Sequence, residues 1–114
     1  MIDVKRGDIW LVNLDPTIGN EIKKTRPAVI IQNDIGNKYS PITIIAPITS
    51  EKGKKVYPFE VLLPKIMGLE SQSKILLSHI RAIDKIRLIK KLGSINIKTM
   101  NFVNDAIKIS LGLE

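Results

Sequence analysis

The chain has 114 residues, 44% of them hydrophobic and 25% charged, which is typical of a globular protein with one modest core. It has no cysteine and a single histidine, which excludes disulfides and cysteine-bound metal centres and disfavours a histidine-based metal cluster. Lysine and arginine outnumber the acidic residues by 18 to 11, and the resulting net charge of +7 favours polyanionic partners such as nucleic acid.

The sequence also bears on location and domain organisation. No apolar run is long enough to span a bilayer, and the first ten residues lack the apolar segment of a signal peptide. No internal repeat, low-complexity segment or linker interrupts the chain. We therefore expect one domain over residues 1–114, located in the cytoplasm and without membrane contact.

Strand patterns separated by turn residues dominate the first three quarters of the chain. Residues 8–14 (DIWLVNL) end at Asp15-Pro16, and residues 27–32 (PAVIIQ) form a β-branched run that predicts a strand buried on both faces. Turn-forming pairs at residues 33–37 predict that this run stops there. Further strands are predicted at residues 42–46 (ITIIA, closed by Pro47), 59–62 (FEVL) and 74–77 (KILL).

Beyond Gly93 the pattern becomes that of a helix, with Asn96 suited to cap its first turn. Apolar residues recur every three or four positions, which places them on one face: Ile97, Met100, Val103, Ile107 and Leu111. Five or more short strands followed by one helix predict a mainly β (α+β) fold, a small barrel or rolled sheet. The helix would cover its open side or help to form a dimer interface.

The residues that could perform chemistry are basic and lie next to loops. Three common motifs, G-x-x-x-x-G-K-[ST], H-E-x-x-H and G-x-S-x-G, are missing, and the aspartates are scattered. One histidine cannot support a two-histidine nuclease. Two loops, residues 15–25 and 49–57, are longer than a tight hairpin needs, and such loops often carry function. If the two buried strands pair, Arg26 and Thr49 meet with lysines on both sides, which suits a phosphodiester. Alternatively, Arg26 forms a structural ion pair and Thr49 is a turn hydroxyl.

Several segments, in this order and spacing, resemble the MazF/PemK toxin family. They are residues 5–16 (KRGDIWLVNLDP), Gly19 with Glu21, residues 25–34 (TRPAVIIQND), residues 44–49 (IIAPIT) and residues 76–88 (LLSHIRAIDKIRL). The likeness spans residues 4–111. It implies an SH3-like small barrel of five to seven short strands with a C-terminal helix, and a homodimer. It also implies the toxin component of a type II toxin–antitoxin system, bound by an acidic antitoxin protein.

The activity implied by the resemblance is that of an mRNA interferase, which cleaves single-stranded RNA sequence-specifically without metal or cofactor. Arg26 and Thr49 match the catalytic residues of the family. The ribose 2′-OH attacks the adjacent phosphorus and leaves 2′,3′-cyclic phosphate and 5′-OH ends, while Arg26 stabilises the charge that develops. The residues expected to bind RNA are Asn20, Lys23, Lys24, Ser50, Lys52, Lys54, Lys55 and His79.

The chain departs from the family at two places. His79 stands where many relatives carry glutamine, so it contacts a base or caps a local turn, and Lys23-Lys24 replaces glycines found in some members. Two other functions remain open: a non-catalytic toxin on the same barrel that poisons DNA gyrase, and a non-catalytic nucleic-acid-binding module. An aromatic content of 4% disfavours the second, because such modules use aromatic stacking platforms.

Overall fold

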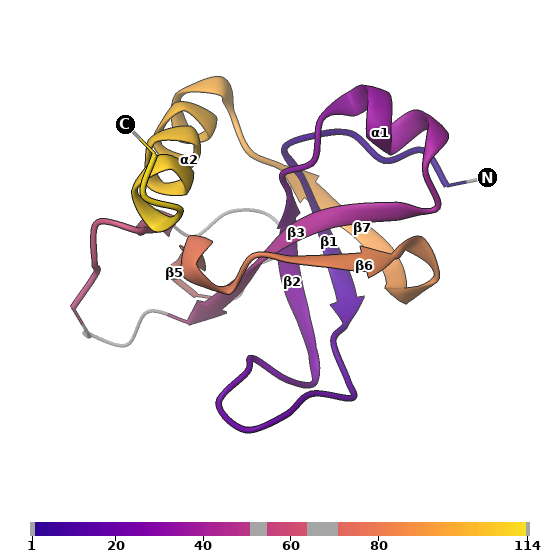
Figure 1. Cartoon of the computed structure of the whole chain (residues 1–114), viewed down its shortest axis with the longest axis horizontal. Helices are drawn as coiled ribbons and strands as arrows, with labels where there is room; N and C mark the ends of the chain where they lie inside the picture. The colour runs from indigo at the N-terminus through magenta and orange to yellow at the C-terminus, as the bar shows by residue number, and fades with distance from the viewer. Residues whose placement is uncertain (1, 51–54, 64–70, 114) are drawn as a thin grey trace.

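The computed structural model describes residues 2–50, 55–63 and 71–113. Within these residues the chain forms seven strands, two α-helices and two 3₁₀ turns (Figure 1). In chain order they are β1 (Asp8–Asn13), β2 (Thr25–Ile30), α1 (Asp34–Tyr39), β3 (Ile42–Ser50), β4 (Glu60–Leu63), β5 (Ser73–Leu76), η1 (Leu77–His79), β6 (Arg81–Asp84), η2 (Lys85–Arg87), β7 (Leu88–Ser94) and α2 (Ile97–Ser110).

The strands form one antiparallel sheet in the order β4-β5-β3-β2-β1-β7, with β6 also paired to β3. This confirms the predicted mainly β fold with a C-terminal helix, and the sheet is open in the described part of the chain. β3 pairs with β2 along one edge; along its other edge it pairs first with β6 and then with β5. Figure 1 shows β5 and β6 towards opposite ends of β3.

The second half of β2, residues 28–30, is buried on both faces, as predicted for the β-branched run at residues 27–32. Ala28 and Ile30 face one core, together with Trp10 and Val12 of β1. Val29 faces a second core on the other side of the sheet, which contains residues of β3, β4, β5 and α2. Because residues of opposite parity point to opposite faces, the part of a strand that is covered on both sides must be apolar at every position.

The prediction that Pro47 ends the third strand is wrong, because β3 continues through it to Ser50. The carbonyl of Ile44 accepts a hydrogen bond from Ile31, so even-numbered residues of β3 direct their backbone groups towards β2. Pro47 therefore faces the other edge, where pairing with β6 ends at Ile45 and pairing with β5 starts at Ile48. The proline lacks an N–H, and it lies where neither ladder needs one.

The turn predicted after β2 is in fact the short helix α1. The side chain of Asn33 accepts the N–H of Gly36 at 2.8 Å and caps the helix. Asn37 is only 2% exposed; its amide donates to the carbonyl of Gln32 at 2.9 Å and accepts the hydroxyl of Thr43 at 2.7 Å. These turn-forming residues therefore begin a helix, because the side chains of Asn33 and Asn37 form hydrogen bonds with the backbone and with Thr43 at the start of β3.

α2 begins after Asn96 as predicted, and the Asn96 side chain accepts the N–H of Thr99 at 2.8 Å. Four residues pack against the core: Met100, Val103, Ala106 and Ile107. Ile97 and Leu111, the ends of the predicted apolar stripe, stay 82% and 60% exposed. In the described residues no helix combines the length and apolarity needed to cross a membrane.

The KRGD segment, residues 5–8, leads into β1 and joins the sheet to α2. Arg6 donates from Nε to the carbonyl of Ile31 at 2.8 Å and from Nη2 to the side chain of Asn104 on α2 at 2.7 Å. Asp8 is 3% exposed and its carboxylate lies 3.3 Å from the ammonium of Lys91 on β7. The contacts of Arg6 and Asp8 therefore stabilise the fold that positions the loops.

Candidate active site

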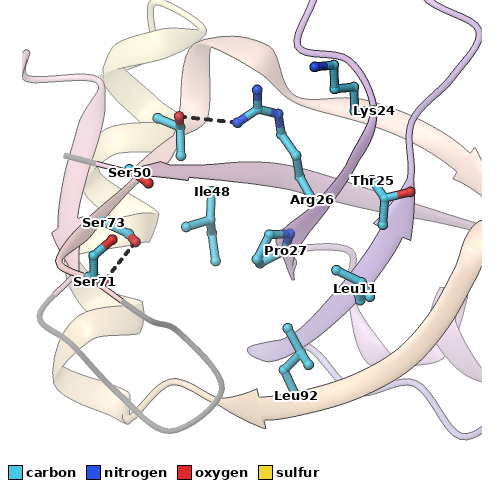
Figure 2. A pocket seen from close by; sticks show the side chains of 11 residues that line it. Leu11, Lys24, Thr25, Arg26, Pro27, Ile48, Ser50, Ser71, Ser73 and Leu92 are labelled. Carbon is cyan, nitrogen blue, oxygen red and sulfur yellow. Dashed lines mark hydrogen bonds between the residues drawn. The ribbon is translucent and has the colours of Figure 1, made fainter. Parts of the chain in front are cut away.

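Arg26 and Thr49 meet at the end of the β2–β3 pair. Ala28 faces Pro47 in the register of these antiparallel strands, so two residues further on Arg26 lies opposite Thr49. The guanidinium Nη1 of Arg26 donates to the hydroxyl Oγ1 of Thr49 at 3.4 Å, drawn as the dashed line from Arg26 in Figure 2. The pairing considered from the sequence therefore does bring these two side chains together.

The guanidinium of Arg26 is oriented by a second bond, from its Nε to the carbonyl of Lys23 at 2.9 Å. Nη2 makes no hydrogen bond within the described part of the chain. The 3.4 Å bond to Thr49 is long and hence weak, so an incoming anion can replace it at little cost. Both side chains are half-buried, which places an oriented guanidinium and a hydroxyl at an open surface.

The pair lies beside a cleft of about 490 Å³ (Figure 2). Its apolar lining includes Leu11, Pro27 and Leu92, and its polar lining includes the hydroxyls of Ser50, Ser71 and Ser73. Apolar surface beside hydroxyl groups suits a nucleobase next to a charged backbone. Sequence reasoning did not single out Ser71 and Ser73; the signal was the SQS segment at residues 71–73, whose last residue begins β5.

Lys24 lies at the end of the first long loop, directly before β2, and lines the same cleft. Its backbone has φ +72°, in the left-handed region that non-glycine residues rarely adopt. Two hydrogen bonds of 3.0 Å fix this conformation: the Lys24 N–H donates to the carboxylate of Asp15, and its carbonyl accepts the N–H of Leu14. A lysine thus occupies a backbone position that suits glycine.

The other residues predicted to bind RNA are distributed around this site. Asn20 and Lys23 are exposed in the first loop, and Ser50 is exposed at the cleft. The ammonium of Lys55 lies 5.1 Å from the ring centroid of Tyr57. Lys52 and Lys54 lie outside the described residues.

His79 lines a second cleft, of about 340 Å³, rather than the one beside Arg26. Glu21 of the first loop, Pro47 of β3 and Arg81 of β6 also line it. The two clefts share β3, since Pro47 borders one and Ile48 the other. Across residues 2–50, 55–63 and 71–113, no three histidine, aspartate or glutamate side chains gather to hold a metal ion.

A buried ion pair that the sequence did not reveal lies next to Thr49. Lys74 on β5 faces Thr49 in the antiparallel register, and its ammonium lies 3.0 Å from the carboxylate of Glu60 on β4. The two side chains are only 11% and 8% exposed. The KILL segment that contains Lys74 reads as a plain strand, so the pairing became visible only from the sheet order.

Comparisons with known proteins identify relatives over nearly the whole chain. The family model described as PemK-like, MazF-like toxin of type II toxin–antitoxin system matches residues 5–111. Endoribonuclease MazF of Staphylococcus saprophyticus is 49% identical over 96% of this chain and 92% of its own length. Endoribonuclease EndoA of Bacillus subtilis is 44% identical over 96% of both chains.

Solved structures with the same architecture include MazF from Deinococcus radiodurans, with a TM-score of 0.84 and 26% identity over 99% of this chain and all of that one. A MazE–MazF crystal structure from the same organism matches with a TM-score of 0.76 and 26% identity, again over 99% of this chain and all of that one.

Proposed function

Because the chain belongs to the family of PemK-like, MazF-like toxins of type II toxin–antitoxin systems and is a MazF-type endoribonuclease, we propose that it cuts single-stranded RNA and that Arg26 and Thr49 are its catalytic residues. The observation that carries the proposal is the Arg26–Thr49 contact at an open, partly apolar cleft. The named relatives are endoribonucleases, which favours RNA cleavage over gyrase poisoning and over binding without catalysis.

The proposed reaction is attack by the ribose 2′-OH on the adjacent phosphorus. A bond forms from the 2′ oxygen to phosphorus and the bond from phosphorus to the 5′ oxygen breaks, leaving a 2′,3′-cyclic phosphate and a 5′-OH. The proton lost by the 2′-OH is balanced by the one gained by the 5′ oxygen. No water or metal is needed as nucleophile or activator, since the attacking group belongs to the substrate.

Arg26 supplies charge stabilisation in this scheme. Its Nε is bound to Lys23, so the Nη groups remain to donate to the non-bridging oxygens as negative charge accumulates on them. The hydroxyl of Thr49 takes a phosphate oxygen or the 2′-OH as its partner in place of the long bond to Arg26. Arginine stays protonated at neutral pH, which suits this role better than that of a general base.

RNA binding is assigned to the polar residues around the cleft and the two loops. Lys23, Lys24 and the second-loop lysines would contact phosphates without reading sequence. His79 is proposed to contact a base from the second cleft, which Pro47 of β3 also lines. The protein would meet its RNA in the cytoplasm.

The proposal includes two protein partners. An acidic antitoxin is expected, because a MazE–MazF assembly is known for a relative and this chain carries a net charge of +7. It would cover loops 15–25 and 49–57 and compete with RNA. A homodimer is also proposed, since Ile97 and Leu111 leave an apolar part of α2 exposed. Light scattering that finds a monomer at micromolar concentration contradicts the dimer.

The test of the reaction is an RNA oligonucleotide with one 2′-deoxy sugar on the 5′ side of the scissile phosphate. It should bind and stay intact, while unmodified RNA yields 2′,3′-cyclic phosphate and 5′-OH ends, in excess EDTA as well as without it. Cleavage of the deoxy-substituted strand, or 5′-phosphate products, means that water attacks and that the roles of Arg26 and Thr49 are wrong. Loss of cutting in EDTA that Mg²⁺ restores contradicts the metal-independent scheme.

A further inference from the structure

Two aromatic side chains lie face to face on the turn that leads into β4. The rings of Tyr57 and Phe59 stack with centroids 5.5 Å apart and planes 2° from parallel. Tyr57 is 45% exposed, and the ammonium of Lys55 lies over its ring, 5.1 Å from the centroid. Exposed aromatic faces close to a lysine are what proteins use to stack an unpaired base and bind the neighbouring phosphate. The mechanism proposed above does not use these rings.

The turn that carries the rings is held by the buried ion pair. The Glu60 carboxylate accepts both the backbone N–H of Tyr57 and the ammonium of Lys74, each at 3.0 Å. The Glu60 N–H donates in turn to the carbonyl of Tyr57 at 2.9 Å. The rings are thus presented by a preorganised turn, which lowers the entropic cost of binding a ligand on them.

The same ion pair connects the rings to the catalytic pair. Lys74 faces Thr49 across the β3–β5 ladder, and neighbouring strands are about 4.8 Å apart. The Lys74 ammonium also donates to the carbonyl of Lys55 at 3.3 Å, which anchors the residue whose side chain covers Tyr57. A strand of RNA whose phosphate is bound at Arg26 and Thr49 therefore has a flanking base within reach of the rings.

We propose that Tyr57 and Phe59 form a stacking site for one unpaired base that flanks the scissile phosphate, with Lys55 binding a phosphate beside it. This inference rests on the proposed cleavage of single-stranded RNA at Arg26 and Thr49. The low aromatic content disfavours a stacking platform when residues are merely counted, but two of the five aromatic residues lie together on one turn.

The probe is a short single-stranded RNA that spans one mapped cut site and carries a 2′-deoxy sugar at the scissile position, so that it binds without being cut. Tyr57→Leu should raise its Kd about 5- to 150-fold, the loss expected for one base–aromatic stack. Tyr57→Phe keeps the ring and should bind like the wild type. Phe59→Leu gives a second measurement if Tyr57→Leu unfolds at a lower urea concentration.

Tyr39 provides a matched control. It is 75% exposed and also lies under a lysine ammonium, that of Lys38 at 5.4 Å, but it has no stacked ring among the described residues. It lies on α1, which precedes the start of β3, whereas Thr49 lies at the other end of that strand (Figure 1). Tyr39→Leu should therefore leave the Kd unchanged.

Abasic nucleotides identify the stacked base. At one position next to the scissile phosphate, removing the base should weaken binding to the wild type but not to Tyr57→Leu. On cleavable RNA, Tyr57→Leu should raise KM with kcat near the wild-type value, because stacking contributes equally to ground state and transition state. Equal Kd values for Tyr57→Leu and Tyr39→Leu, or additive effects at every abasic position, overturn the stacking site. Absence of RNA cleavage by the wild type overturns the proposed function itself.

Discussion

Lys74 stands directly opposite Thr49 in the antiparallel pairing of β3 with β5, yet its ammonium is bound to Glu60 and largely withdrawn from solvent. Two cations thus flank Thr49 in the sheet, and they differ in kind. Lys74 is neutralised inside the protein, whereas Arg26 keeps N–H donors directed to an open cleft. We therefore assign the phosphate to Arg26 and a structural role to Lys74.

Glu60→Ala should destabilise the fold by about 3–5 kcal/mol, because it leaves the buried Lys74 ammonium without its anion. The double variant Glu60→Leu with Lys74→Met should recover most of this loss, since an apolar pair of similar size needs no charge compensation. Urea unfolding measures both. A Glu60→Ala protein within about 1 kcal/mol of the wild type shows that the ion pair does not stabilise the fold.

Arg26→Lys and Thr49→Val should each lower kcat/KM on RNA about 100- to 1,000-fold while the protein stays folded. Lysine keeps the positive charge of arginine but lacks its planar guanidinium, which can donate two parallel hydrogen bonds. Valine keeps the shape of threonine but lacks its hydroxyl. Thr99→Val on α2 is the control for the second change and should cut like the wild type. A variant that retains wild-type kcat/KM with an unchanged unfolding midpoint leaves its residue with a structural role only.

Lys24→Gly should change stability and RNA binding in opposite directions. Glycine adopts the left-handed φ of +72° without a clash, so unfolding should require up to about 1 kcal/mol more. Loss of one cation at the cleft should weaken RNA binding and reduce its salt dependence. Lys23→Gly, next to it and without a left-handed φ, should weaken binding but gain no stability. A destabilised Lys24→Gly protein contradicts the strain argument.

The stability of the fold should fall in acid partly through Asp34. A backbone N–H of Arg6 at 2.7 Å, then the side chain of Asn37, hold the pKa of this carboxyl below its ordinary value of 3.8. A lowered pKa stabilises the folded state above the ordinary value and loses this effect as the pH falls through the folded-state pKa. Asp34→Asn should therefore be less stable than the wild type at pH 7, and the difference should shrink below pH 3.8. Urea midpoints across this range measure it; a constant difference contradicts the assignment.

The elements with regular hydrophobic patterns were predictable from sequence. The β-branched run of β2 and the spacing along α2 each determine one arrangement, because a slip would expose apolar side chains. β7 was missed because its LIKKLGS segment does not alternate; two register shifts against β1 interrupt its pairing. β3 was predicted too short because its extension through Pro47 depends on the change of partner from β6 to β5, which is a tertiary property.

Some features of the candidate site were likewise predictable from sequence, and others were not. The proximity of Arg26 and Thr49 follows from the pairing of two recognisable strands, so spacing and resemblance sufficed for it. The Lys74–Glu60 pair depends on how β4 pairs with β5, which local patterns do not encode. His79 has its own cleft, and only the folded chain reveals that this cleft is separate from the one beside Arg26.

β3 takes part in three ladders, with β2, β5 and β6, and it also carries Thr49. Amide protons near its centre that face β2, such as that of Ala46, should exchange with solvent only when this inner ladder opens, so their exchange rates should report global unfolding. The loop at residues 15–25 is largely exposed and should open locally at lower cost. A protease should therefore clip that loop in the native protein, whereas cutting the buried centre of β3 requires the sheet to open first.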